Sequence, residues 1–228
     1  MLHYCTQATP LFRKVDDYNR PPLSTQNANA GQSPIPGKLI VRPVNAMNRA
    51  VFIDRDGTLN VHAGYIVHPD QLHVYDFTGP AVRRLNDAGW LCVLVTNQGI
   101  IARGECSFEQ LTAIHRKLAD TLAAHGAHLD GIYVCPHHPL AGPLCDCRKP
   151  SPGLLRQAAH ELDIDLGRSW TVGDSTSDIA AGFAAGTSTA LVETGLAGSD
   201  GRCAVHPDLQ VPDFLSFVNA VCPTRARS

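Results

Sequence analysis

The chain has 228 residues, of which 44% are hydrophobic, and a formal net charge of −2. This length and apolar content allow one sizeable core, so we expect one main domain. A charge this close to zero gives no basic field of the kind that binds nucleic acid or anionic membranes, and no apolar stretch reaches the roughly 18 residues of a membrane span. The first residues also lack a basic and then apolar signal pattern, so we expect a cytoplasmic protein.

The first part of the chain differs in composition from the rest. Residues 1–48 are rich in Pro, Asn, Gln and Ser and show no sustained hydrophobic period, which predicts a disordered or poorly structured extension. We expect residues 49–222 to form the folded domain and residues 223–228 to form a short tail. Met47 lies immediately before the first predicted strand, so we hypothesise that the protein starts there and that residues 1–46 are a tail or a start-site artefact.

From residue 50 onward, apolar runs alternate with helical patterns, which is typical of a parallel sheet covered by crossover helices. The patterns predict strands at 50–54, 91–95, 131–134, 170–173 and 189–192, and helices at 79–88, 108–125, 152–162, 176–185 and about 213–221. Helix starts are predicted at Thr78 and Ser107, and helix stops at Gly89 and Gly126. We therefore predict an α/β fold, a Rossmann-like parallel sheet with helices on both faces and no large cap domain.

Two aspartates, Asp54 and Asp56, stand where the first apolar run gives way to Gly57. The run suits a buried strand, so Asp54 should lie at its carboxyl end, where ligands bind in open α/β sheets. One carboxylate can attack phosphorus and the other can manage a proton, provided that a cation offsets the charge. The spacing indicates a phosphoryl-transfer centre. The alternative is two acids that cap a turn.

Two further segments supply groups that can bind phosphate. Thr96 ends the second predicted strand, so its hydroxyl and the nearby backbone N–H groups can hold phosphate oxygens. Arg148 and Lys149 precede the helix predicted at 152–162. Lys149 supplies a point charge for the transferred phosphoryl group, and Arg148 can bind a second phosphate bidentately.

A magnesium site is predicted from the remaining acids. Asp174 ends the strand predicted at 170–173, and Mg²⁺ prefers oxygen ligands while it keeps several waters. We assign Asp54, Asp174 and the carbonyl of Asp56 as its ligands. Asp178 lies one turn into the next helix, where it either orients Asp174 or a bound water or is simply a first-turn acid favoured by the helix dipole.

A cluster of cysteines and histidines lies just before these cations. Its members are Cys135, His137, His138, Cys145 and Cys147. Three thiols and one imidazole fit a closed tetrahedral Zn²⁺ site, with His137 as the ligand and His138 as the spare, while a disulfide is the alternative. Such a site leaves no position for water, so we expect a structural zinc that fixes the loop carrying the two cations.

Four of these segments resemble, in this order, the four motifs of the haloacid dehalogenase superfamily of aspartate-dependent phosphatases over about residues 50–195. They are the segments that carry Asp54 and Asp56, Thr96, Arg148 and Lys149, and Asp174. The resemblance implies that Asp54 attacks phosphorus to form an aspartyl-phosphate. It also implies that Asp56 protonates the leaving oxygen and later activates water, while Thr96 and Lys149 hold the phosphoryl oxygens.

Within the superfamily, a cysteine loop directly before Arg-Lys-Pro is similar to that of two families, the D-glycero-D-manno-heptose 1,7-bisphosphate 7-phosphatases and the histidinol-phosphate phosphatases. Residues 60–65, 96–104 and 129–139 resemble segments of the heptose family. The resemblance implies a magnesium-dependent phosphatase for a small sugar bisphosphate. The absence of a sizeable inserted cap between the motifs predicts a monomer. The candidate substrate-binding residues are Arg55, His62, Gly64, Tyr65, Asn97, Gln98, Gly99, Arg103, Arg148 and Ser175.

Some features depart from the heptose pattern. Gly99 replaces the usual Ser, Ser175 stands where many members carry Lys, and the short loop from His137 to Cys145 resembles the histidinol-phosphate group. Histidinol-phosphate phosphatase therefore stays the first alternative. A DNA 3′-phosphatase would need a basic groove, which the net charge disfavours, and a non-catalytic zinc-stabilised binding module would not account for four intact motifs.

The other cysteines and histidines carry no metal pattern. His115 and His125, on the helix predicted at 108–125, are expected to face solvent, and Cys92 is expected to be a small core residue. No partner pattern is found for Cys5, Cys106, Cys203 and Cys222.

Overall fold

The structure is a computed structural model that describes residues 12–13, 47–141 and 145–223. Its strands form one seven-stranded sheet in the order β1-β4-β3-β2-β5-β6-β7. The strands are β1 (Phe12–Arg13), β2 (Ala50–Ile53), β3 (Leu91–Asn97), β4 (Gly131–Cys135), β5 (Trp170–Gly173), β6 (Ser188–Val192) and β7 (Leu209–Val211). All neighbouring pairs are parallel except β1 and β4, which are antiparallel.

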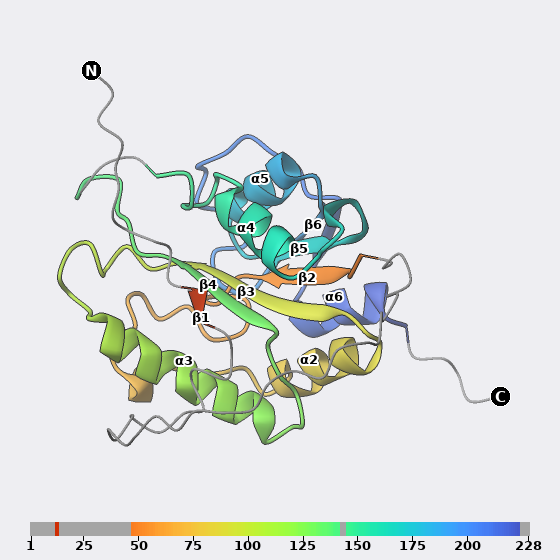
Figure 1. Cartoon of the computed structure of the whole chain (residues 1–228), viewed down its shortest axis with the longest axis horizontal. Coiled ribbons are helices and arrows are strands. Elements are labelled where there is room, and N and C mark those ends of the chain that lie inside the picture. The colour runs from red at the N-terminus through yellow and green to blue at the C-terminus, as the bar shows by residue number, and fades with distance from the viewer. Residues whose placement is uncertain (1–11, 14–46, 142–144, 224–228) are drawn as a thin grey trace, which may run out of the picture.

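Helices cover both faces of this sheet (Figure 1). The α-helices are α2 (Thr78–Asp87), α3 (Phe108–Ala123), α4 (Gly153–Glu161), α5 (Thr176–Ala185) and α6 (Phe214–Val221). Two short 3₁₀ helices, η1 and η2, cover Pro69–Gln71 and Leu166–Arg168. No domain-sized insertion separates the strands within residues 47–141 and 145–223, so the prediction of a fold without a large cap is confirmed.

The core explains why the apolar runs form the central strands. Side chains of a strand alternate between the two faces, and accordingly Val51 and Ile53 join the cluster under α2, α3 and α6, whereas Phe52 joins the cluster under α4 and α5. All four residues of β2 are buried. A strand buried on both faces requires an unbroken apolar sequence, which is what the chain supplies.

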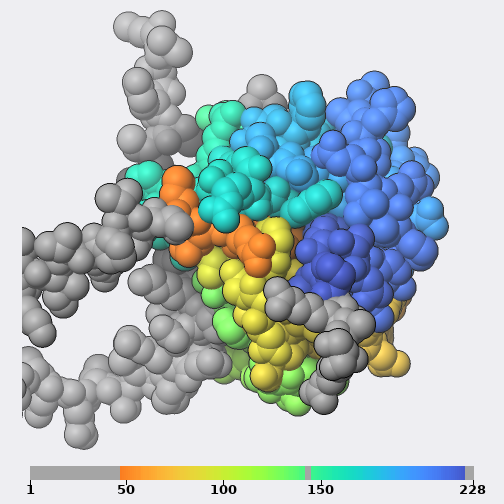
Figure 2. All heavy atoms as spheres, turned by 90° about the vertical axis from the view of Figure 1, so that its right-hand side faces the viewer, coloured from red at the N-terminus to blue at the C-terminus, as the bar shows by residue number. Residues whose placement is uncertain are grey.

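The last helix closes one side of the fold. α6 packs against α2, β6 and β7, and Figure 2 shows its atoms (dark blue) beside those of the α2–β3 segment (yellow). Phe214 and Phe217 from this helix are fully buried, and the ring of Phe217 lies edge-on to Trp170 at the start of β5. The helix thereby covers the apolar face of the strands that position the site. Among the residues that the structure describes, no helix has the length and apolarity needed to cross a bilayer.

The predicted parallel sheet and its helices are confirmed, and each predicted element ends within two residues of the observed one. The short strands β1 and β7 were not predicted. β1 lies in the segment expected to be poorly structured, yet it pairs with β4. Asn48, in the same segment, forms an isolated bridge with Ile164. The expectation is therefore wrong at Phe12, Arg13 and Asn48, because these residues pair with the domain. The other residues before Met47, Cys5 included, lie outside the described residues.

The four predicted helix ends are confirmed. Ser107 caps α3 through a capping box with Gln110, and Gly89 and Gly126 follow α2 and α3 with positive φ. α2 begins at Thr78 as predicted, and the hydroxyl of Thr78 donates to the carbonyl of Leu59 at 2.7 Å instead of capping the helix. The oxygen of that hydroxyl therefore ties α2 to the loop that follows β2.

Candidate active site

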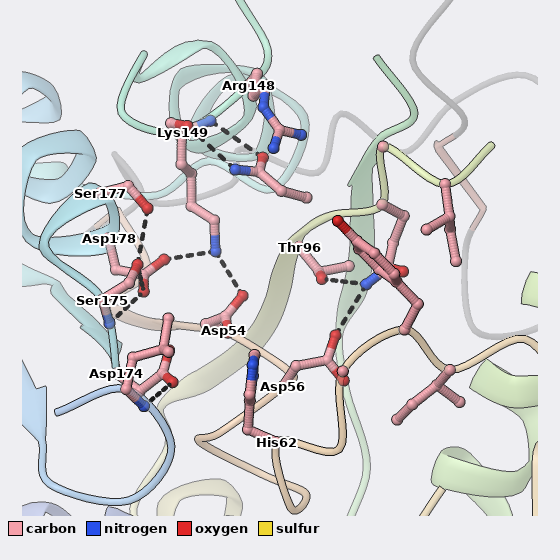
Figure 3. A pocket seen from close by; sticks show the side chains of 18 of the residues that line it. Asp54, Asp56, His62, Thr96, Arg148, Lys149, Asp174, Ser175, Ser177 and Asp178 are labelled. Atoms are coloured by element: carbon pink, nitrogen blue, oxygen red, sulfur yellow. Dashed lines mark hydrogen bonds and ion pairs between the residues drawn. The ribbon is translucent and has the colours of Figure 1, made fainter. Parts of the chain in front are cut away.

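A pocket opens at the carboxyl ends of β2, β3 and β5, where the predicted catalytic side chains converge (Figure 3). We call its inner part, formed by Asp54, Asp56, Thr96, Lys149, Asp174 and Asp178, the floor. The other predicted residues that line the pocket are His62, Gly64, Tyr65, Asn97, Gln98, Gly99, Arg148 and Ser175. Two predicted substrate-binding residues, Arg55 and Arg103, are not among the lining residues.

Lys149 lies between two carboxylates of the floor. Its ammonium is 2.6 Å from Asp54 Oδ1 and 2.6 Å from Asp178 Oδ1, and it also donates to the carbonyl of Val95 at 2.7 Å. Burial lowers the pKa of Lys149, but the charges of Asp178 and Asp54 outweigh burial and hold the pKa above its usual value. Lys149 is therefore a fixed cation beside the oxygen of Asp54.

Three carboxylates gather within reach of a single ion. Asp54, Asp174 and Asp178 can each offer one oxygen, and these oxygens lie within 4.8 Å of one another. Burial, together with the nearby carboxylates, raises the pKa of Asp54 to about 7 and that of Asp174 to about 8. Such a buried set of oxygen donors, short of positive charge, fits a hard divalent cation such as Mg²⁺.

Asp174 is held in a tightly packed position. Its Oδ2 accepts the backbone N–H of Leu196 at 2.7 Å, and its own carbonyl accepts the N–H of Gly198 at 2.8 Å. A Cβ atom at Gly57 or Gly195 would lie 2.1 Å from Asp174 Oδ2, and both glycines have positive φ. Only glycine fits at these two positions, so the turn after β2 and the loop after β6 together fix the carboxylate of Asp174.

Asp178 has its second oxygen engaged locally. Its Oδ2 accepts the backbone N–H of Ser175 at 3.1 Å and the Ser175 hydroxyl at 2.7 Å, which forms a capping box at the start of α5. Its Oδ1 meets Lys149, as Figure 3 shows. Asp178 therefore both caps the helix and positions Lys149. Ser175, which was expected to contact substrate, lines the pocket and also bonds to Asp178.

Asp56 is held by three side chains. Arg55 donates to both of its oxygens, with a shortest distance of 2.7 Å, Asn60 donates at 3.0 Å and Gln98 donates at 3.1 Å. Burial raises the pKa of Asp56, but the Arg55 charge and these hydrogen bonds outweigh burial, so the pKa is lower than usual. Arg55 is fully buried, lies outside the pocket lining and positions Asp56, so its predicted contact with substrate has no support from this geometry.

His115 is a correction, because it is fully buried instead of facing solvent. Its Nε2 lies 3.3 Å from Nη1 of Arg55. Burial and the Arg55 charge lower the pKa of His115 to about 3, so the ring is neutral and can accept from Arg55. His115 follows the buried Leu111 by four residues and precedes the buried Leu118 by three, a helical spacing that could have indicated its burial.

The end of β3 connects the catalytic groups to one another. Gln98 Nε2 donates to Thr96 Oγ1 at 2.9 Å as well as to Asp56. Asn97 donates to the carbonyl of Lys149 and accepts its backbone N–H, both at 3.1 Å. Asn97 and Gln98 line the pocket, and they also position Lys149 and Asp56.

Gly99 allows two segments to approach closely. A Cβ atom here would lie 3.0 Å from His138 Cδ2, 3.1 Å from the carbonyl of His137 and 3.3 Å from Arg148 Nη1. Arg148 Nη1 donates to that same carbonyl at 2.9 Å. The missing side chain at Gly99 therefore leaves room for Arg148 at the wall of the pocket.

The predicted zinc ligands form one cluster, which we call the thiol cluster: Cys135, His137, Cys145 and Cys147, each offering an atom within 4.8 Å of the others. The Sγ of Cys135 lies 3.7 Å from that of Cys145 and 3.2 Å from that of Cys147, and His137 Nδ1 lies 3.2 Å from Cys147 Sγ. All the cysteines that the structure describes are free thiols, so the disulfide alternative is wrong for these residues. His138 Nδ1 instead accepts the N–H of Leu140.

The outer rim is formed partly by the loop after Asp56. His62, Gly64 and Tyr65 line the pocket, and Tyr65 is 61% exposed. Arg103 lies over the Tyr65 ring at 4.3 Å and pairs with Glu105 at 2.7 Å. Arg103 therefore supports Tyr65 from outside the pocket lining, and its contact with substrate stays a prediction.

Sequence reasoning missed some residues of the wall. They are Ile66, Ile100, Ser177, Leu196 and Arg202. Ser177 lies three residues after Asp174, so its place in the pocket wall could have been inferred from the sequence. Arg202 lies in the loop after β6, which carries no motif, so only the folded structure brings it to the pocket.

The sequence of this chain is similar to those of known proteins. A family model described as HAD-hydrolase-like matches residues 146–217. The chain is 47% identical over 154 residues to a D-glycero-β-D-manno-heptose-1,7-bisphosphate 7-phosphatase of Pasteurella multocida, which covers 65% of this chain and 84% of that protein. The protein of the same name in Escherichia coli K12 is 43% identical over 152 residues, which cover 64% and 80% of the two chains.

A solved structure resembles the fold as well. It is a D,D-heptose 1,7-bisphosphate phosphatase from B. bronchiseptica complexed with magnesium and phosphate, with a TM-score of 0.70 and 35% identity, and the match covers 76% of this chain and 97% of that one. The floor residues, the sheet order and these similarities agree with one another. The chain belongs to the D-glycero-D-manno-heptose-1,7-bisphosphate 7-phosphatase family of haloacid dehalogenase-like phosphatases.

Proposed function

We propose that this protein removes the 7-phosphate from D-glycero-D-manno-heptose 1,7-bisphosphate, in the synthesis of nucleotide-activated heptose. One observation carries the proposal. The pocket combines a phosphoryl-transfer floor with a second cation, Arg148, that the floor does not use. The relatives named for this reaction, at 43–47% identity, support the same substrate.

The reaction has two steps. In the first, an oxygen of Asp54 attacks the phosphorus of the 7-phosphate, the bond from phosphorus to the C7 oxygen breaks, and Asp56 donates a proton to that oxygen. This step uses the fraction of molecules in which Asp56 is protonated, which its lowered pKa makes small near neutral pH. In the second, Asp56 takes a proton from water, the water oxygen attacks the phosphorus of the aspartyl-phosphate, and inorganic phosphate leaves with Asp54 regenerated. Thr96 and Lys149 hold the phosphoryl oxygens through both steps.

We infer that the carboxylates of Asp54 and Asp174, with the carbonyl of Asp56, hold Mg²⁺. The three-carboxylate group described above suits such an ion. When bound, Mg²⁺ supplies positive charge that lets an anionic nucleophile approach an anionic phosphate. Asp178 completes the surroundings by orienting Lys149.

We further infer that the thiol cluster holds a structural Zn²⁺. In a tetrahedral site with Zn–S bonds of about 2.3 Å, two sulfur atoms lie about 3.8 Å apart. The Sγ atoms of Cys135 and Cys145 are 3.7 Å apart. The carbonyl of His137 anchors Arg148. Zinc would therefore fix the segment that carries the second cation.

The assembly and location are also inferences. We propose that residues 49–222 act as a monomeric phosphatase domain in the cytoplasm, because the pocket is complete within one chain. Light scattering of the purified protein should give the mass of a monomer, 24.5 kDa. A dimer mass would contradict that inference.

Phosphate release from a substrate panel tests the function. The panel contains both anomers of heptose 1,7-bisphosphate, histidinol phosphate and a 3′-phosphorylated oligonucleotide, each with Mg²⁺. We expect the highest kcat/KM for one of the two bisphosphates. Preference for histidinol phosphate or for the oligonucleotide would overturn the proposed substrate, and absence of release from every substrate would favour a non-catalytic binding module.

A further inference from the structure

The pocket shares a wall with a second cavity of about 490 Å³. The residues common to both are Arg148, Lys149 and Arg202, so all three shared side chains are cationic. A boundary of this kind between two cavities suits an anionic group of a ligand that extends from one into the other.

Only two of these cations are available to such a group. Lys149 is 5% exposed and already sits between Asp54 and Asp178. Arg148 uses Nη1 for the carbonyl of His137 at 2.9 Å, and its guanidinium lines both cavities. An arginine carries five N–H donors, so it can hold a carbonyl and a phosphate together.

Among the described residues, Arg202 forms only a long ion pair with Asp200. Its Nε lies 4.0 Å from Asp200 Oδ2, at the limit of an ion pair. Asp200 is engaged instead by Thr176, whose backbone N–H donates to it at 2.7 Å and whose hydroxyl donates at 2.9 Å. In the part of the chain that the structure describes, the guanidinium of Arg202 therefore reaches the wall of the pocket with only this long ion pair to Asp200, whose carboxylate is shared with Thr176.

The loop that carries Arg202 is built into the site. Leu196 and Gly198 donate to Asp174, and Cys203 donates to the hydroxyl of Thr176 at 3.1 Å. The loop is thus tied both to a floor carboxylate and to the start of α5. Arg202 is a cation held at the rim by these contacts, although its side chain is 60% exposed.

We propose that Arg202 joins Arg148 in binding the phosphate of the substrate that is not cleaved, so that the two arginines select bisphosphates over monophosphates. The inference deepens the proposed function and rests on it. The floor gathers four carboxylates, so a second phosphate is held only where cations outnumber acids, and the boundary between the two cavities meets that condition. Paired arginines can each bind phosphate bidentately.

Selectivity kinetics test the assignment. The ratio of kcat/KM for heptose 1,7-bisphosphate to that for heptose 7-phosphate is measured in the wild-type protein, Arg202→Gln, Arg202→Lys and the control Arg168→Gln. Arg168 is an exposed arginine at the end of η2, away from the lining of both cavities. We expect Arg202→Gln to lower the ratio about 10- to 100-fold, mainly through KM for the bisphosphate. Arg202→Lys should lower it less, and Arg168→Gln should keep the wild-type ratio.

Binding of the product gives a readout independent of turnover. Heptose 1-phosphate should bind Arg202→Gln about 10-fold more weakly than the wild-type protein in calorimetry, with the thermal midpoint of the variant unchanged. An unchanged ratio, or an equal loss with both substrates, would overturn the role of Arg202. If the wild-type protein released no phosphate from the bisphosphate, the proposed function would fail and this assignment with it.

Discussion

The floor of the pocket stands on the carboxyl ends of three buried strands, whereas its wall and rim are loops fixed by other means. Asp54 and Asp174 each directly follow a strand of the core, and Thr96 is the second-to-last residue of β3. Arg148 is placed by the carbonyl of His137 in the thiol cluster. The loop that carries Arg202 is placed by hydrogen bonds that Leu196 and Cys203 donate to Asp174 and Thr176. The difference suggests a division of labour, in which the sheet positions the chemistry and the loops choose the substrate.

This comparison predicts that floor variants change kcat and that wall variants change KM. The floor acts on the reacting phosphorus, where interactions strengthen in the transition state. The wall binds a group that stays the same through the reaction, so its contribution is uniform binding.

The largest effect is expected for Asp54→Asn. An amide is a poor nucleophile, so kcat should fall by about 10⁴-fold or more. Phosphate release gives the rate, and circular dichroism checks that the fold is intact. Turnover near the wild-type value would show that Asp54 is not the nucleophile.

Asp56→Asn should have the next largest effect, about 10²- to 10⁴-fold on kcat, because a general acid and base is lost. In this variant, the rate of the first step should fall less with an aryl phosphate, because its leaving oxygen needs little protonation. Pre-steady-state release of the aryl alcohol measures that step. An equal loss with sugar and aryl phosphates would argue against Asp56 as the acid.

Cys145→Ser should act through the loop and not through the floor. We expect loss of zinc and a fall in thermal midpoint of roughly 5–10 °C, together with a raised KM for the bisphosphate as Arg148 loses its anchor. Zinc content by atomic absorption and a melting curve are the measurements. Cys203→Ser, outside the thiol cluster, is the matched control, and unchanged zinc in Cys145→Ser would contradict the ligand assignment.

The smallest effect is expected behind the floor, at His115. Replacement by Leu removes an acceptor from buried Arg55, so kcat should fall about 3- to 10-fold through a less well-held Asp56. His115→Gln keeps an acceptor and should recover part of the loss. If Leu and Gln lowered kcat equally while stability stayed the same, the hydrogen bond to Arg55 would not be the cause.

The sequence predicts the floor better than the wall for a physical reason. Asp54, Thr96 and Asp174 each end an apolar run, and parallel strands bring such ends together at one edge of the sheet. The thiol cluster is equally readable, since three thiols and an imidazole in one short segment indicate a metal.

Local sequence patterns do not predict which way a side chain points or which distant residues it contacts. Arg55 follows the nucleophile and was expected to face substrate, yet it turns toward His115, sixty positions away along the chain. Arg103 likewise contacts a residue far away in the sequence, the ring of Tyr65. Arg202 comes from a loop without a motif, and its place depends on contacts made by Leu196 and Cys203 with distant residues.

The most direct test of the division between floor and wall is the position of bond cleavage. Wild-type protein is mixed with heptose 1,7-bisphosphate and Mg²⁺, and both phosphates are followed by ³¹P NMR. We predict that the 7-phosphate signal is replaced by that of inorganic phosphate while the 1-phosphate signal persists. Release of the 1-phosphate first, or of both at equal rates, would contradict a floor that cleaves one phosphate while the wall retains the other.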